Sequence, residues 1–578
     1  MKFIKSIFAS CLGVLLFSVV VMAIIIAALA GSSSAEDVKN DSVLLVSLDG
    51  VIVEKKDNNF YDNLMQSAEP TNALNEILLA IQNAKSDDRI KGICLKTNAV
   101  DAGYATMEEI RSALEDFKTS GKFVYAYSGL YTQGAYYVAT AADSLFMNPQ
   151  GSLNYSGISS SSLFFKDFLK KVGVEFQVVR VGSYKSYAES FVGDSMSAEN
   201  KEQLDALISS IWNGILEKIS VDRNIPKEEL ASLADSLIPL SPAPYVLEKG
   251  LVDGLKYKDE FLQVLREKLS LNDNDDVPTV SVSDYLLANN LGEEISVPGM
   301  DEVAVVYLNG EIDNGSKGGI NSTEAVRLLS ELGKNPDVKA IVLRINSPGG
   351  SAYGSEQICH MVENVKKYKP VVASLGDYAA SGGYYIASNA NEIVSNESTI
   401  TGSIGVIALI PNAQELADKL GVHYETVKTN KNADLLENFF RPMSDFERTA
   451  MQRSVDDFYH TFVQRCAEGR MLSYEQVDSC AQGRVWSGVD ALNRQLVDRY
   501  GTLSDAVKEA ALLANVSDYQ TISYPKKKNI LEQLEEIPSL GYEKLKENEV
   551  FSKEKIIFGK IRSLDRVQAV LPYTIELR

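Results

Sequence analysis

The sequence predicts an α/β protein in which two tandem copies of one domain follow an apolar N-terminal segment. Two observations predict this fold. Segments of the first half recur in the second: IKGICLKTN at Ile90 matches VKAIVLRIN at Val338, and QGAYYVA at Gln133 matches SGGYYIA at Ser381, both at an offset of 248 residues (338 − 90 and 381 − 133). Short β-rich strands also alternate with helical segments in each copy, which favours parallel sheets covered by helices.

The apolar segment covers residues 7–30, which are 24 residues without a charge. A helix of that length spans the hydrocarbon core of a membrane, which is about 30 Å thick. Lys2 and Lys5 precede it, so we expect the N-terminus to stay in the cytoplasm and the rest to be exported. A cleaved signal peptide is the alternative, but its apolar region is usually only about 7–15 residues long. We therefore expect residues 1–40 to form a cytoplasmic N-terminus and an uncleaved transmembrane anchor.

Each predicted copy opens with an apolar strand and contains a long amphipathic helix. In the first copy, residues 41–285, the strands VLLVSL, GICLK and KFVYAY surround the helical TMEEIRSALEDF, and the long helix falls near 199–220. In the second copy, residues 286–525, VAVVYL, AIVLR and PVVASL surround SEQICHMVENVKKY, and the long helix falls near 445–467. The segment DNDDVPTVSVSD at 273–284 is expected to be part of the connection. The Lys/Glu-rich extension at 526–578 has no counterpart in the first copy.

Composition narrows the classes of partner and cofactor. The net charge of −21 excludes nucleic acid as the main partner, because phosphate binding needs a basic surface. The five cysteines show no CxxC spacing of the kind that binds metals, and we expect neither a metal nor a cofactor. An exported domain could pair Cys466 with Cys480, although buried free thiols are equally compatible with the pattern.

The two copies differ at the positions where chemistry is expected. After the matching strand, copy two reads NSPGGSAYGSE where copy one reads NAVDAGYATME. Ser381 of copy two aligns with Gln133 of copy one, while Lys185 of copy one aligns with Ala433 of copy two. The serine and its glycines therefore belong to one half, and the lysine belongs to the other.

Ser381 is either a helix cap or a nucleophile. A nucleophilic serine needs a base and a site that stabilises the oxyanion formed when it attacks a carbonyl. Gly349 and Gly350 directly follow a predicted strand, and Gly382 stands at a predicted helix start. Backbone N–H groups at such positions can act as oxyanion donors, with the helix dipole assisting the last one.

The sequence offers two kinds of base. His360 lies in a predicted helix, His423 in a strand-like segment and His460 in the long amphipathic helix, and none of them belongs to a motif. A Ser-His-Asp triad stays open, because its members need not be close in the chain. The alternative is a neutral Lys185, which requires the pKa of a lysine to fall from about 10.4 to near 7–8. Burial or a nearby cation can lower it.

The ordered motifs SPGGS, ASGGYY and TGSIGV, with an upstream GSYKS in a duplicated and anchored chain, resemble the signal peptide peptidase SppA family in its long 67K form. The resemblance covers nearly the whole chain up to about residue 525. It implies a serine protease with a Ser/Lys dyad, in which Ser381 is the nucleophile and Lys185 the general base. It further implies that Gly349 and the Gly382 amide form the oxyanion hole, and that Ser403 orients the lysine.

The resemblance also implies a setting for this chemistry. The fold would be of the ClpP/crotonase type, built from repeated β-β-α units, and the assembly a homotetramer. The substrates would be signal-peptide remnants and other apolar peptides at the bacterial cytoplasmic membrane, with the catalytic domains on the exported, periplasmic side. Two competing functions use the same fold: an acyl-thioester enzyme of crotonase type, and a non-catalytic membrane scaffold. Access to CoA is poor outside the cytoplasm, and an inactive scaffold has no use for intact Ser381, Lys185 and Gly349.

Overall fold

The computed structural model describes residues 37–56, 71–291, 297–313, 319–435, 439–526 and 567–570, together with residues 13 and 17. The expected membrane anchor at residues 7–30 lies outside the described residues apart from those two positions, as does most of the extension at 526–578. Within the described part of the chain, no helix combines the length and the apolar character that a membrane span requires.

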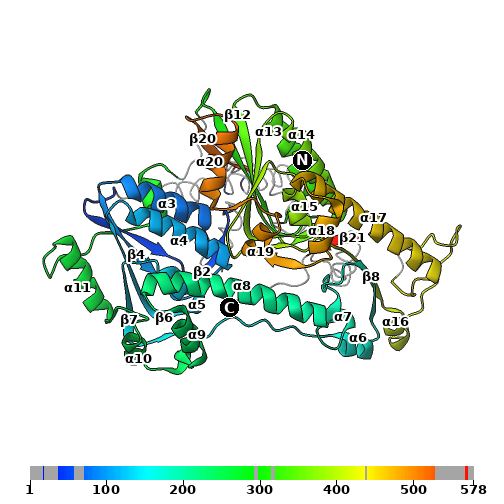
Figure 1. Cartoon of the computed structure of the whole chain (residues 1–578), viewed down its shortest axis with the longest axis horizontal. Helices are drawn as coiled ribbons and strands as arrows, with labels where there is room; N and C mark the ends of the chain where they lie inside the picture. The colour runs from blue at the N-terminus through cyan, green and yellow to red at the C-terminus, as the bar shows by residue number, and fades with distance from the viewer. Residues whose placement is uncertain are drawn as a thin grey trace, which may run out of the picture.

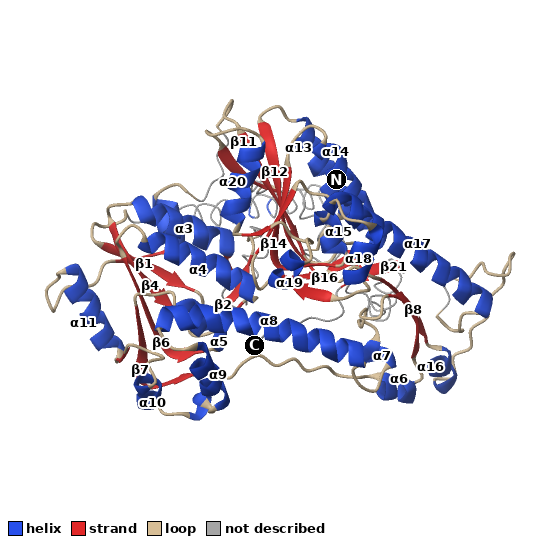
Figure 2. Ribbon diagram, in the orientation of Figure 1, coloured by secondary structure: helices blue, strands red, loops and turns tan. Residues whose placement is uncertain are grey.

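The first half forms a parallel sheet in the order β10-β1-β4-β6-β7-β9, with helices packed against it (Figures 1 and 2). Its strands are mostly buried apolar runs, as parallel strands covered on both faces require. The strands are β1 (Ser42–Ser47), β4 (Ile90–Lys96), β6 (Phe123–Tyr131), β7 (Ser144–Leu153), β9 (Gly254–Leu255) and β10 (Thr279–Ser281). The helices are α3 (Leu74–Ser86), α4 (Tyr104–Lys118), α5 (Gln133–Ala139), α6 (Lys166–Val172), α7 (Glu189–Val192), α8 (Ala198–Arg223), α9 (Lys227–Asp235), α10 (Ala243–Glu248), α11 (Lys258–Leu269) and α12 (Val282–Ala288), with a 3-10 turn, η1, at Ile238–Leu240.

The second half repeats this strand order as β20-β11-β12-β14-β15-β19, and all of these pairs are parallel. Two further strands, β16 and β18, extend the sheet beside β14. The strands are β11 (Glu302–Asn309), β12 (Val338–Ser347), β14 (Val371–Ala380), β15 (Glu392–Ser395), β16 (Ile400–Gly402), β18 (Val485–Ser487), β19 (Arg499–Tyr500) and β20 (Gln520–Tyr524). The helices are α13 (Ser322–Lys334), α14 (Ala352–Lys366), α15 (Gly382–Ala387), α16 (Gln414–Lys419), α17 (Asp445–Arg470), α18 (Tyr474–Cys480), α19 (Gly488–Asn493) and α20 (Leu503–Leu513). The expected long helices are α8 and α17, each of 26 residues.

A third sheet joins the two halves in the order β13-β21-β17-β8. Its strands are β8 (Glu175–Val181) from the first half, and β13 (Gly349–Ser351), β17 (Val406–Asn412) and β21 (Val567–Val570). β8 pairs antiparallel with β17 along its whole length. In Figure 1, α8 runs across the lower part of the view from the first sheet toward α7 and β8, so an arm of the first half reaches the second. A smaller sheet, β3-β2-β5, is made of β2 (Gly50–Val53), β3 (Thr71–Ala73) and β5 (Val100–Asp101).

Two expectations about local structure are wrong. The segment 273–284 is not simply a connection, because β10 within it pairs with β1 and forms the edge of the first sheet. It occupies the position that β20 occupies in the second sheet. His423 lies in a loop after α16 and not in a strand. Its neighbours are exposed, so the alternating pattern there has no core to face.

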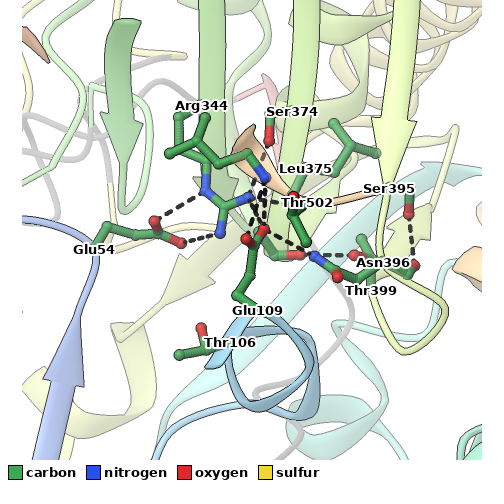
Figure 3. Close-up of polar contacts among 12 residues, drawn as sticks. Glu54, Thr106, Glu109, Arg344, Ser374, Leu375, Ser395, Asn396, Thr399 and Thr502 are labelled. Carbon is green, nitrogen blue, oxygen red and sulfur yellow. Dashed lines mark hydrogen bonds and ion pairs between the residues drawn. The ribbon is translucent and has the colours of Figure 1, made fainter. Parts of the chain in front are cut away.

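A buried ionic cluster fastens the two halves together (Figure 3). The Arg344 guanidinium of β12 donates to both carboxylate oxygens of Glu54, at 2.9 and 3.0 Å, and to Glu109 of α4 at 3.0 Å. Its other contacts are with the Ser374 hydroxyl and the Leu375 carbonyl. Arg344 and both acids are buried, and each acid comes from the first half. This part of the contact between the halves is therefore ionic, and each guanidinium hydrogen bond to the first half has a named partner.

Candidate active site

Ser381 lies at the junction between β14 and α15. Its backbone has φ 55° and ψ −117°, a conformation that residues other than glycine rarely adopt. Its N–H donates to the Gly402 carbonyl at 2.8 Å, and its own carbonyl accepts from the Tyr385 N–H at 2.9 Å, which begins the helix. The hydroxyl does not cap that helix. Of the two roles that the sequence allowed for this serine, helix capping is therefore excluded.

The Lys185 side chain reaches Ser381 from the other half of the chain. Its Nζ lies 2.7 Å from the Ser381 Oγ, and it donates to the carbonyl and the hydroxyl of Ser403 at 3.0 Å each. All three side chains are 0% exposed. Burial lowers the pKa of Lys185 well below the usual value of a lysine. The structure thus brings together three of the predicted site residues, and burial is the cause of the pKa shift.

Close backbone packing holds the lysine in this position. Lys185 follows β8, and the Arg180 Nη1 of that strand donates to the Lys185 carbonyl at 2.9 Å. Gly483 of the second half lies so near that an added Cβ would be 2.6 Å from the Lys185 Cβ. On the other side, a Cβ on Gly405 would be 3.2 Å from the Lys185 Cδ. These two glycines leave just enough room for the lysine stem.

Gln203 on α8 links the lysine loop to the second half. Its Nε2 donates to the Tyr184 carbonyl at 2.9 Å and to the Ser186 hydroxyl at 3.2 Å, while its Oε1 accepts from the Val485 N–H at 3.2 Å. The side chain is buried. Sequence reasoning missed this residue. The available signal was a glutamine one turn before Leu207 on the apolar face of the predicted helix.

The two predicted oxyanion glycines lie side by side. Gly349 has φ 107° within β13, and a Cβ added to it would be 2.8 Å from the Gly382 nitrogen. Gly382 is the first residue of α15, where backbone N–H groups have no partner inside the helix. The Gly349 N–H donates to the Ser347 hydroxyl at 3.2 Å. The structure therefore brings both glycines next to Ser381, with one amide hydrogen-bonded to another side chain.

The remaining candidates lie away from Ser381. His360, His423 and His460 are exposed, whereas Ser381 is fully buried, so none of the three can hydrogen-bond to it. In the first half, Gln133 uses its amide to bind the Tyr104 hydroxyl and the Gly157 backbone. Ala433, the counterpart of Lys185, is exposed. The position in the first half that corresponds to Ser381 is therefore occupied by Gln133, whose side chain has a structural role.

The described residues contain no group of three or more His, Cys, Asp or Glu side chains that could hold a metal ion. Cys466 and Cys480, which the sequence allowed to pair, are both free thiols, as are Cys94 and Cys359. Burial raises the pKa of Cys94 and Cys359 to about 12, so these thiols are unreactive at neutral pH.

Comparison with known proteins identifies the family. The model of peptidase family S49 matches residues 116–272 and 363–517, more than half of the chain. This chain belongs to peptidase family S49. The S49 peptidase is 33% identical over 520 residues to Protease 4 from Haemophilus influenzae, covering 86% of this chain and 83% of that protein. It is 32% identical to Protease 4 from Salmonella typhi over 528 residues, with 87% and 83% covered. It is 31% identical to the chloroplastic serine protease SPPA from Arabidopsis thaliana over 490 residues, with 83% and 70% covered.

These relationships make the chain an enzyme, a serine peptidase related to Protease 4 and SppA proteins. A solved ClpP1 mutant structure from Listeria monocytogenes matches with a TM-score of 0.24 and 17% identity, covering 35% of this chain and 94% of that one. That similarity is too weak to assign a fold by itself. The mixed α/β architecture with two matched S49 regions comes from the structure and the family model.

Proposed function

We propose that this S49 peptidase is a membrane-anchored serine endopeptidase that degrades cleaved signal peptides with a Ser/Lys dyad. Ser381 is the nucleophile and Lys185 the general base. The observation that carries this proposal is the 2.7 Å contact between the Lys185 Nζ and the Ser381 Oγ in a fully buried site. Burial favours the neutral amine, and only a neutral amine can accept a proton from the serine.

In the first step, Lys185 takes the Ser381 proton while the Oγ attacks the substrate carbonyl. The scissile C–N bond then breaks, and the lysine returns the proton to the leaving amine. Water, deprotonated by the same lysine, hydrolyses the acyl-enzyme and regenerates the serine. Ser403 keeps the Nζ directed at Ser381 through its two hydrogen bonds of 3.0 Å. The positive φ of Ser381 supports this role, because it keeps the hydroxyl away from the helix amides that it would otherwise cap.

The oxyanion would be stabilised by backbone donors of Gly382 and Gly349. The Gly382 N–H stands at the start of α15, where the helix dipole favours negative charge. The Gly349 N–H would have to exchange the Ser347 hydroxyl for the oxyanion. Loss of one such donor costs about 3 kcal/mol of transition-state stabilisation.

The setting of the reaction is also proposed. We assign residues 1–40 to an anchor in the bacterial cytoplasmic membrane, 41–285 and 286–525 to the two domain copies on the periplasmic side, and 526–578 to an extension. The copies would be of ClpP/crotonase type and the assembly a homotetramer. Substrates would be signal-peptide remnants and other apolar peptides. A relative from Enterococcus faecium named putative signal peptide peptidase SppA, 32% identical over 246 residues, supports this substrate class.

The test uses the full chain in detergent with a synthetic apolar signal-peptide fragment, and products are read by mass spectrometry. Ser381→Ala, Lys185→Met and Lys185→Arg are compared with the matched control Lys201→Met, since Lys201 is an exposed lysine on α8. We expect all three site variants to lose about 10²–10⁴-fold in kcat/KM while remaining folded. Lys185→Arg retains a cation but no base, because arginine stays protonated.

The wild-type rate should rise with pH through one pKa that is well below that of free lysine. Near-normal turnover by Lys185→Met would rule out the lysine base. A fully active Lys185→Arg would mean that the residue supplies only positive charge. If the wild type cleaves no apolar peptide, the signal-peptide substrate class is wrong.

A further inference from the structure

Arg484 lies in the short segment between α18 and β18 that closes over the lysine. The backbone of this segment binds the chain on both sides of the site. The Tyr184 N–H donates to the Gln482 carbonyl at 2.9 Å, and the Ser403 N–H donates to the Arg484 carbonyl at 2.7 Å. The segment therefore holds both the residue that precedes Lys185 and the serine that binds its Nζ.

The Arg484 guanidinium lies over two aromatic rings. Its Cζ is 4.7 Å from the centroid of the Tyr184 ring and 4.5 Å from that of the Trp486 ring. Its Nη1 forms an ion pair of 2.8 Å with Glu202 of α8, and the Tyr184 hydroxyl donates to the same carboxylate at 3.3 Å. The Nε is buried and has no hydrogen-bond partner among the described residues. Two ring faces and one carboxylate therefore fix this planar group, as the shape of an arginine allows.

The Trp486 ring carries the contacts of Arg484 on to the nucleophile. This ring is only 6% exposed, and a Cβ on Gly402 would lie 2.8 Å from its Cδ1. The Gly402 carbonyl accepts the Ser381 N–H at 2.8 Å. The contacts of Arg484 therefore extend to the backbone of the nucleophile as well as to the lysine loop.

We propose that Arg484 is a positioning residue of this peptidase, which keeps Lys185 enclosed by clamping Tyr184 of the lysine loop against Trp486 of β18. This inference rests on the proposed function, in which Lys185 is the general base. Without the guanidinium, the Tyr184 ring would lose the group that it packs against, and the lysine loop would separate more easily from the second half. Water would then reach the amine, and the pKa of Lys185 would rise toward that of a free lysine.

The charge of Arg484 is offset, so its planar shape carries the effect. Arg180 of β8 lies 4.0 Å from Glu189 of α7, and Arg484 lies 2.8 Å from Glu202 of α8. The groups that contact the lysine Nζ are two serine hydroxyls and a carbonyl, all of them uncharged. Burial is the cause of the lowered pKa of Lys185. Arg484→Lys would keep the positive charge but lose the planar contact with both rings.

The experiment measures kcat/KM of the full chain in detergent for an apolar peptide as a function of pH. Wild type is compared with Arg484→Met, Arg484→Lys and the matched control Arg494→Met. Within the described residues, Arg494 lies over the same Trp486 ring at 3.6 Å but over no ring of the lysine loop. Thermal unfolding of each variant is recorded in parallel.

We expect both Arg484 variants to raise the apparent pKa of the rate profile by about one unit, which lowers the rate about tenfold at pH values below the wild-type pKa. Most of the loss should disappear at high pH, where the lysine is neutral in every variant. Arg494→Met should unfold at a lower temperature and keep the wild-type pKa, because it removes a contact with the tryptophan but none with the lysine loop.

Three results would overturn the role of Arg484. The first is a loss of rate that is equal at all pH values, since this indicates a general effect on the fold. The second is a wild-type profile in Arg484→Lys, which would assign the effect to charge. The third is an equal pKa shift in Arg494→Met. If Arg484→Met does not fold, Arg484→Lys decides, because it keeps the ion pair with Glu202.

Lys185→Met, measured in the same series, separates this inference from the proposed function. Normal turnover by Lys185→Met overturns both, because the lysine is then not the base. An inactive Lys185→Met together with unshifted profiles of both Arg484 variants overturns only the positioning role of Arg484.

Discussion

The buried cluster around Arg344 gives the sharpest stability prediction. The Arg344 side chain is 0% exposed, and those of Glu54 and Glu109 are 3% and 1% exposed. Replacing Arg344 with methionine keeps most of the volume but leaves two carboxylates in the interior without their counter-charge. Removing one member of a buried ion pair costs about 3–5 kcal/mol. We expect the free energy of unfolding of Arg344→Met to fall by that amount.

The assay is urea denaturation of the full chain at pH 7, followed by far-ultraviolet circular dichroism. Arg327→Met is the control, since Arg327 forms an exposed pair with Glu331 and should change stability by less than about 1 kcal/mol. The triple variant Glu54→Gln, Glu109→Gln, Arg344→Met should regain most of the loss, because it removes all the buried charges together. If Arg344→Met unfolds at the same urea concentration as Arg327→Met, the cluster does not stabilise the contact between the halves.

Three further predictions concern the same interface and site. Burial raises the pKa of Glu108 from 4.5 to about 7, so the folded state binds more protons than the unfolded state between these values, and stability falls as pH rises through that window. Glu108→Gln should therefore raise the free energy of unfolding by up to about 3 kcal/mol at pH 8 and have little effect at pH 4, and an equal gain at both pH values would contradict this cause. Ser403→Ala should lower kcat about tenfold with little change in KM, because one hydrogen bond to Lys185 is lost. An unchanged kcat in steady-state kinetics would disprove the proposed role of Ser403 in orienting the lysine. Gln203→Leu should lower kcat and shift the pH–rate profile. Gln203→Glu can still accept a hydrogen bond from the Val485 N–H, so its unfolding temperature should fall less than that of Gln203→Leu. Equal unfolding temperatures of these two variants would show that this hydrogen bond is not needed.

The sequence predicted the features that local pattern and repetition determine. The strand order of the second sheet repeats that of the first because the same apolar runs and helices recur in the same order. Ser381 and Lys185 could be singled out because the duplication gave each an internal comparison that lacks it. Their contact across 196 residues of sequence could not be derived from spacing, because it depends on the pairing of β8 with β17 and on the packing around Lys185.

The features that sequence missed depend on distant partners. The strand β10 is only three residues long and is recognisable through its pairing with β1, not through its composition. β21 is likewise recognisable as a strand only through its pairing with β13 and β17. The sequence does not show that Gln203 contacts both the lysine loop and β18. The helical period places Gln203 on the apolar face of α8, but it does not identify the groups that the side chain binds.

Splitting the site between two halves has a direct electrostatic consequence. The low pKa of Lys185 comes from burial, and that burial exists only when the second half closes over it with Gly405 and Gly483. Separation of the halves would expose the amine to water and return its pKa toward that of a free lysine. An amine with the ordinary pKa of a lysine is protonated at neutral pH, and it could not act as the proposed base. The contacts that join the halves, from the Arg344 cluster to the β8–β17 ladder, thus also maintain the burial that lowers the pKa of Lys185.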